Sequence, residues 1–151
     1  MTRRQDAFVG AEFDWFAIGG AGQLALCASA GWGEIPSSIL EAASANPDAG
    51  IGSTDLSQAL IQSLPETGGH LCEAHGPGTC NDWRLLGNRG VYVYDWVHWA
   101  GPYARIIVPE FPLGVEEVGA GLLARLRAIA VPHLRFANCS TFDGSKLGAQ
   151  E

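Results

Sequence analysis

Residues 90–99 read Gly-Val-Tyr-Val-Tyr-Asp-Trp-Val-His-Trp, and this stretch decides the fold class. Valine alternates along it with aromatic side chains and one histidine. Successive side chains of a β-strand point to opposite faces of a sheet, so an extended backbone separates the two sets. The pattern therefore predicts a strand over 85–99 with an aliphatic face and an aromatic face. The residues expected on the aromatic face are Tyr92, Tyr94, Trp96 and His98.

A second segment of the chain shares features with this one. Residues 12–36 and 90–112 each carry an Asp-Trp step and each end in proline. A Gly-Gly-Ala-Gly turn at 19–22 folds the first segment back on itself, and Gly101-Pro102 turns the second. The sequence therefore predicts two β-hairpins.

Helices are expected between the hairpins and after them. One opens after Pro36 and closes at Asn46, and a second runs from Ser53 or Thr54 to Pro65. Apolar residues at helical spacing predict a third over 115–129. A long loop is expected over 66–83, and a last strand is expected in the alternating stretch 134–142. The order β-β-α-α-β-β-α-β predicts an α+β fold whose mostly antiparallel sheet is built from hairpins, with helices packed on it.

Length and composition indicate one domain. The chain has 151 residues, of which 47% are hydrophobic, enough for a single substantial core. We expect that domain to span 1–143, followed by a flexible polar tail over 144–151.

The charge of the chain limits its partners. Nine basic and sixteen acidic residues give a formal charge of −7, which disfavours nucleic acid and favours a basic protein partner. Residues 15–33 carry no charge, but glycines interrupt them, so we expect no membrane span. The N-terminal residues lack a signal-peptide pattern, and a cytoplasmic location is expected by default.

The cysteines are few and scattered, so reduced, mostly buried thiols are expected and no disulfide scaffold. The densest group of potential metal ligands is His70, Cys72, His75 and Cys80. Zinc accepts such side chains, but their spacing does not match a common zinc motif. An incidental grouping in a solvated loop is the favoured interpretation, and no cofactor is predicted.

Three carboxylates could support catalysis. Glu12 and Asp14 alternate in the first hairpin, and Asp95 follows the aromatic residues of the second. Paired carboxylates perform acid/base chemistry on glycosides, and aromatic platforms bind sugar rings. A small carbohydrate-active or other hydrolytic enzyme using these three residues is therefore the alternative function. The favoured interpretation places the acids in solvent or on turn amides.

Both hairpins resemble an uncharacterised family of small bacterial proteins. The resemblance rests on Glu-Phe-Asp-Trp-Phe-Ala at 12–17, Ala-Gly-Trp-Gly-Glu-Ile-Pro at 30–36, Gly-Val-Tyr-Val-Tyr-Asp-Trp at 90–96, Tyr-Ala-Arg at 103–105 and the stretch 109–113. It covers most of the chain outside 66–83. Where that family is expected to have an Asp-containing turn, this chain has the glycines of 19–22.

An acidic, tryptophan-rich single domain is also similar in character to the immunity proteins that neutralise polymorphic bacterial toxins. This likeness implies a non-catalytic domain that covers a basic toxin, with carboxylates steering the partner and aromatic side chains anchoring it. The candidate anchors are Trp32, Tyr92, Tyr94, Trp96 and Trp99. Some of them must belong to the core, because exposing all five would leave an unusually large apolar patch.

Overall fold

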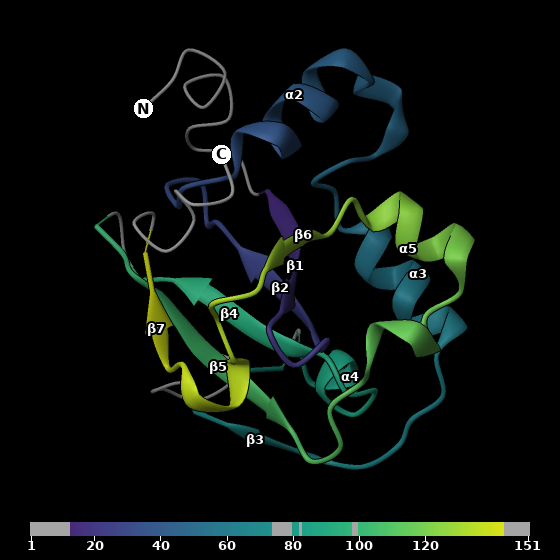
Figure 1. Cartoon of the computed structure of the whole chain (residues 1–151), viewed down its shortest axis with the longest axis vertical. Helices are drawn as coiled ribbons and strands as arrows, with labels where there is room; N and C mark the ends of the chain where they lie inside the picture. Colours follow the sequence, from purple (N-terminus) through teal and green to yellow (C-terminus); the bar gives the residue numbers. More distant parts are fainter. Residues whose placement is uncertain (1–12, 74–79, 82, 98–99, 144–151) are drawn as a thin grey trace.

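The computed structural model describes residues 13–73, 80–81, 83–97 and 100–143. Within these residues the chain forms a seven-stranded sheet with helices packed against it (Figure 1). This arrangement confirms the α+β class. No helix in the described part of the chain is long and apolar enough to cross a membrane.

The two predicted hairpins form the centre of the sheet. β1 (Asp14–Gly19) pairs antiparallel with β2 (Leu24–Ala28), and the glycine turn connects them. β4 (Tyr92–Trp96) pairs antiparallel with β5 (Tyr103–Pro109). The alternating sequence of each segment therefore produces the strands that it predicts.

The sheet is mixed, so the expectation of a mostly antiparallel sheet is wrong. β2 pairs with β4 in parallel, which joins the two hairpins, and β1 pairs in parallel with β6 (Ile129–Val131). Parallel neighbours need a long crossover connection. The chain between β2 and β4 contains helices and supplies one, so β4 enters the sheet in the same direction as β2.

Two short strands complete the sheet. β3 (His70–Cys72) and β7 (Thr141–Phe142) both pair with β5, and the strand order is β3-β5-β4-β2-β1-β6 with β7 beside β5. The predicted loop over 66–83 therefore contains a strand. The predicted last strand is also shorter than expected, because Phe136 begins the 3-10 turn η3 (Phe136–Asn138) instead.

The helices agree in part with the sequence pattern. The first two predicted helices are α2 (Ser37–Ala45) and α3 (Asp55–Ser63), with the 3-10 turn η1 (Pro47–Ala49) between them. α4 (Arg84–Gly87) lies in the region predicted as strand. The third predicted helix divides into η2 (Val115–Glu117) and α5 (Ala120–Leu126). α5 ends because Arg127 adopts a left-handed conformation with φ 55°.

Both faces of the sheet are buried, and they differ in composition. One face carries Trp15, Tyr92, Tyr94 and other members of an aromatic cluster, which α2 and the segment 131–142 cover. The opposite face carries aliphatic side chains and packs against α3, α4 and α5. Figure 1 shows α3 and α5 together on one side of the molecule and α2 apart from them. The predicted separation of the valines at 91 and 93 from the tyrosines at 92 and 94 is confirmed.

A β-bulge maintains this separation on β5. Val93 pairs with Ile107, whereas Tyr94 pairs with Arg105, so Ile106 is an extra residue on β5. Such an insertion shifts the alternation by one residue. Ile106 and Ile107 consequently both join the aliphatic cluster, while Tyr103 joins the aromatic one.

Candidate functional site

Three of the five expected aromatic anchors lie in the core. Tyr92, Tyr94 and Trp96 are 1%, 0% and 7% exposed. β4 is an internal strand, with β2 on one side and β5 on the other, and α2 and the segment 131–142 cover its aromatic face. These three side chains are therefore not surface anchors, which corrects the expectation. Trp32 is 50% exposed and remains a candidate, and Trp99 lies outside the described residues.

The aromatic core contains directed hydrogen bonds. Nε1 of Trp15 donates to the Tyr103 hydroxyl at 3.0 Å, and that hydroxyl donates to the carbonyl of Glu34 at 2.8 Å. A Cβ on Gly33 would lie 2.6 Å from the same hydroxyl, so glycine allows this close approach. Burial raises the pKa of Tyr103 well above its ordinary value. The phenol therefore stays neutral and acts as a structural hydrogen-bonding group.

The two described carboxylates of the catalytic alternative lie in one row of the sheet. Asp14 of β1 pairs with Ala28 of β2, and Ala28 pairs with Asp95 of β4. Two strand spacings separate the acids, which places their Cα atoms roughly 10 Å apart. Asp14 is buried and Asp95 is half-buried. Their strands are not direct neighbours, and Glu12 lies outside the described residues.

The cysteines of the proposed metal group form a disulfide. Cys72 and Cys80 are joined, with their Cα atoms 6.1 Å apart, so the expectation of reduced thiols is wrong for this pair. A disulfide removes both sulfurs as metal ligands. Nδ1 of His70 lies 2.8 Å from Oδ1 of Asn88, and His75 falls outside the described residues. Among the described residues, no group of three or more potential ligands could hold a metal ion.

The edge of the sheet at β3 carries an exposed apolar surface that sequence reasoning did not predict. Leu71 is 68% exposed and Phe111 is 57% exposed. Beside them lies a groove of about 400 Å³ between β3 and the end of β5, lined by Gly69, His70, Leu71, Val108, Pro109 and Glu110. We call Leu71, Phe111, this groove and the neighbouring Glu73 the β3 edge surface. The sequence feature that could have indicated this surface is that Leu71 and Phe111 are single large apolar residues among glycine, proline and polar residues.

The outer side of the β3 backbone pairs with no other strand among the described residues. Glu73 donates its N–H to the carbonyl of Ile106 at 2.8 Å, and the carbonyl of Gly69 accepts from Glu110 at 2.9 Å. In an antiparallel ladder alternate residues bond to the neighbouring strand. The backbone groups of His70 and Cys72 consequently point away from β5. In the described part of the chain β3 pairs with β5 alone.

An ion pair connects β3 to the segment that covers the aromatic face. Arg105 Nε lies 2.7 Å from one carboxylate oxygen of Glu73, and its Nη2 lies 3.2 Å from the other. Nη1 of Arg105 donates to the carbonyls of Phe136 and Ala137. The hydrogen bond to Glu73 raises the pKa of Arg105. This one guanidinium therefore fixes the position of Glu73 relative to η3.

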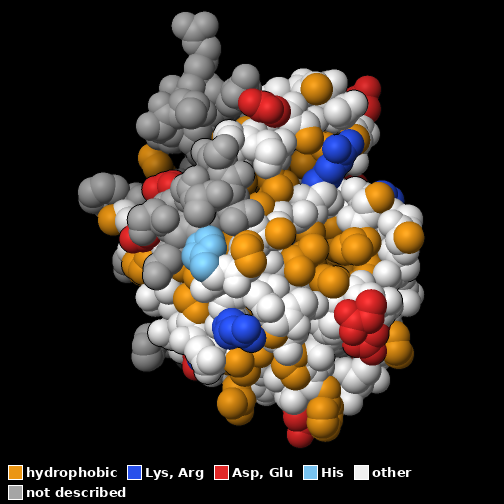
Figure 2. All heavy atoms as spheres, in the orientation of Figure 1, with side chains coloured by type: hydrophobic (Ala, Val, Ile, Leu, Met, Phe, Trp, Pro, Cys, Tyr) orange, Lys and Arg blue, Asp and Glu red, His pale blue; other side chains and the backbone are white. Residues whose placement is uncertain are grey.

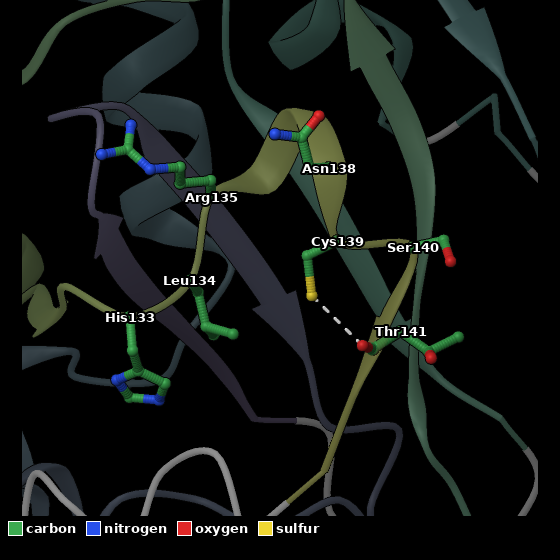
Figure 3. A pocket seen from close by; sticks show the side chains of 7 residues that line it. All are labelled: His133, Leu134, Arg135, Asn138, Cys139, Ser140 and Thr141. Carbon is green, nitrogen blue, oxygen red and sulfur yellow. Dashed lines mark hydrogen bonds between the residues drawn. The ribbon is translucent and has the colours of Figure 1, made fainter.

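A polar pocket lies in the connection between β6 and β7. Figure 3 shows its seven lining side chains, with His133 and Arg135 on one side and Cys139 and Thr141 on the other. Figure 2 shows this side of the molecule, where a histidine and a basic side chain lie near each other. The Cys139 thiol donates to the carbonyl of Thr141 at 3.1 Å. Sequence reasoning did not identify this pocket, because no motif marks it.

Comparison with known proteins identifies no relative. No family model matches the chain, and neither the curated proteins nor the solved structures contain a match. The functional conclusion therefore rests on the surface and its chemistry.

Proposed function

We propose that the chain is a non-catalytic protein-binding domain of the immunity type, and that it docks a basic partner on the β3 edge surface. The observation that carries this proposal is the exposure of Leu71 and Phe111 beside a strand edge with which no other described strand pairs. Large apolar side chains at such positions are unfavourable in water and serve as anchors for a partner. We also propose, on the sequence resemblance described above, that the chain is related to the uncharacterised bacterial family.

The charge of the chain favours a basic partner. Its formal charge is −7, and Glu110 adjoins Phe111, while the nearby Glu73 is paired with Arg105. Complementary charge accelerates the encounter and selects the partner, while buried apolar anchors hold it. Binding is therefore expected to weaken as salt concentration rises.

The disulfide suggests where this encounter takes place. Disulfides persist mainly in oxidising compartments, and Cys72 belongs to β3 itself. We therefore assign the docking surface to an oxidising compartment. It differs from the cytoplasmic location expected by default from the N-terminal sequence, which stays a prediction.

Capture of a basic toxin-type domain on immobilised variants tests the proposal. A Leu71→Asp/Phe111→Asp double variant is expected to lose at least ~30-fold in affinity, as two anchor positions acquire charge in the interface. Trp32→Ser is the comparison variant, because Trp32 is the alternative anchor, is 50% exposed and lies in the turn after β2. Equal capture by the wild type and the double variant, or loss with Trp32→Ser alone, would contradict the β3 edge surface.

Glycoside hydrolysis remains a second candidate because Asp14 and Asp95 share one row and one face of the sheet. Inverting glycosidases hold their carboxyl groups about 6.5–9.5 Å apart, a range that side chains on alternate strands can reach. Hydrolysis of chromogenic glycosides that disappears with Asp95→Asn would establish it. Hydrolysis that persists in Asp95→Asn would reject this function. Failure of every wild-type preparation to hydrolyse the substrates would also reject it.

A further inference from the structure

We propose that the pocket between β6 and β7 binds a small carboxylate ligand that carries a short apolar group. The site is lined by different residues from the β3 edge surface and does not depend on the proposed function. It has a volume of about 420 Å³. Ligand pockets in proteins measure ~300–1,000 Å³, so the space suits a small molecule.

The charge of the lining favours an anion. His133 and Arg135 line the pocket together with Asn138, Ser140 and Thr141, and its described lining includes no aspartate or glutamate. The chain as a whole is strongly acidic. A basic and neutral lining on such a chain produces a local field that selects anions.

Arg135 is available to a ligand. It is exposed, and within the described residues its guanidinium forms no ion pair or hydrogen bond. A guanidinium presents paired donors that match the two oxygens of a carboxylate. Figure 3 shows Arg135 and His133 on the side of the pocket opposite Cys139 and Thr141, with their side chains extending in different directions.

The backbone carbonyls of the connection already accept other hydrogen bonds. Arg105 binds the carbonyls of Phe136 and Ala137 through its side chain and that of Ser140 through its N–H at 2.8 Å. The Tyr94 hydroxyl donates to the carbonyl of Cys139. Carbonyl oxygens repel an anion, and these are occupied by donors from the sheet. A bound carboxylate would therefore accept hydrogen bonds from side chains, while the backbone of the connection is already held in place by the sheet.

The interior of the pocket favours a ligand with an apolar part. Leu134 is 3% exposed and offers a ligand little surface, whereas the Cys139 side chain is half-buried and Thr141 is exposed. Figure 3 shows these side chains within the group of lining residues. An aliphatic group on the carboxylate would cover the accessible part of Cys139 and the Thr141 methyl group and release water from them. Inorganic phosphate lacks such a group and is expected to bind more weakly.

Cys139 supplies a reporter for the test. Cys72 and Cys80 are in a disulfide and Cys27 is fully buried, so alkylating reagents report on Cys139. Iodoacetate is itself a small carboxylate. The Cys139 thiolate attacks its methylene carbon, a C–S bond forms, and iodide leaves with the C–I electron pair while the thiol proton passes to solvent. Neutral iodoacetamide reacts by the same steps and is the control.

The alkylation rate is measured against reagent concentration. We expect saturation with iodoacetate and a linear dependence with iodoacetamide. Arg135→Gln should abolish the saturation and lower the iodoacetate/iodoacetamide rate ratio about five-fold, a change typical of one partly exposed charge. Arg127→Gln, at an exposed arginine outside the lining, should leave the ratio unchanged. A linear iodoacetate dependence, or an unchanged ratio in Arg135→Gln, would overturn the proposal.

Protection of Cys139 from iodoacetamide provides a second test that needs no variant. Isovalerate should slow alkylation, whereas isovaleramide, its neutral analogue, should not. If isovaleramide protects equally, the site does not recognise a carboxylate. If inorganic phosphate protects as well as isovalerate, the apolar part of the ligand is irrelevant and the proposal is wrong in that respect.

Discussion

The two faces of the sheet are equally buried but are stabilised differently. On the aromatic face, rings pack in edge-to-face, tilted and stacked pairs, and hydrogen bonds join some of them. The ring centroids of Trp15 and Tyr103, for example, are 5.8 Å apart with their planes at 80°. On the aliphatic face, Leu24, Leu26 and Val93 pack against helices. Non-directional packing tolerates exchange among side chains of similar volume, whereas a hydrogen-bonded ring does not. The comparison therefore predicts different sensitivities to substitution.

The largest effect is expected when a ring is removed from the aromatic face. Tyr103→Ala should lower the free energy of unfolding by about 3–5 kcal/mol, because a cavity forms and the Trp15 N–H loses its acceptor. Leu26→Ala, on the other face, should cost less within the ~2–5 kcal/mol range for buried leucine. Urea denaturation measures both. A larger loss in Leu26→Ala would reverse the comparison.

The disulfide is expected to have the next largest effect. Cys72 lies on β3 and Cys80 belongs to the aliphatic cluster, and their sequence separation is 8. Loop-closure entropy for a ring of this size predicts a loss of about 2.5 kcal/mol in a Cys72→Ser/Cys80→Ser variant. Denaturation of the wild type with and without reductant should show the same difference. An unchanged midpoint would mean that the disulfide does not stabilise β3.

Removing the Tyr103 hydroxyl tests whether directed hydrogen bonds stabilise the aromatic face. Tyr103→Phe keeps the ring but leaves the Trp15 N–H and the Glu34 carbonyl unpaired, so a loss of about 1–3 kcal/mol is expected. Leu26→Met, a volume-conserving change on the aliphatic face, should cost less than about 1.5 kcal/mol. Equal losses in the two variants would show that hydrogen bonding does not distinguish the faces.

High pH should destabilise the protein through its aromatic face. Burial raises the pKa values of Tyr94 and Tyr103, and burial followed by the Asp14 charge raises the pKa of Cys27. Raised folded-state values favour the neutral forms, so this stability is complete below the unfolded-state pKa. The contribution of Cys27 decreases above about pH 9 and that of the tyrosines above about pH 10, by about 1.4 kcal/mol per pH unit for each group.

The measurement is the unfolding free energy from neutral to alkaline pH. Tyr103→Phe should show a shallower decrease than the wild type, because one ionising group is absent. Leu26→Met should follow the slope of the wild type. If Tyr103→Phe also follows that slope, Tyr103 does not contribute to the alkaline loss.

The smallest effect is expected at the ion pair between β3 and the aromatic cover. Glu73→Gln keeps the shape of the side chain and removes its charge. The Glu73 side chain is 39% exposed, so solvent screens the pair and a loss of at most about 1 kcal/mol is expected. High salt should reduce the difference between the variant and the wild type. A difference that persists in high salt would indicate a hydrogen-bond effect rather than a charge effect.

The sequence predicts the two hairpins but not the segments that pack over the faces of their strands. Alternation at residues 91–94 separates the two faces correctly. It cannot show that both faces are buried, because α2 and the segment 131–142 reach the tyrosines only through tertiary packing. The parallel pairing of β2 and β4 depends in the same way on the path of a long connection.

The candidate sites were less predictable than the fold. Cys72 and Cys80 are close enough for a disulfide only in the folded chain, and their spacing in sequence does not show this. Leu71 is exposed because β3 is an edge strand, a position that a three-residue strand does not reveal in sequence. The lining of the β6–β7 pocket has no motif, since its side chains are brought together by Arg105 and Tyr94 from elsewhere in the sheet.

The parallel pairing of β1 with β6 determines the order in which the molecule can be completed. Ala17 pairs with Ile129, so β1 is synthesised more than a hundred residues before the strand with which it pairs in parallel. Until then the outer edge of β1 is available to other nascent chains, and contacts this distant in sequence form slowly. We expect chains that terminate before residue 129 to associate through β1, and cellular yield to depend on how quickly synthesis reaches β6.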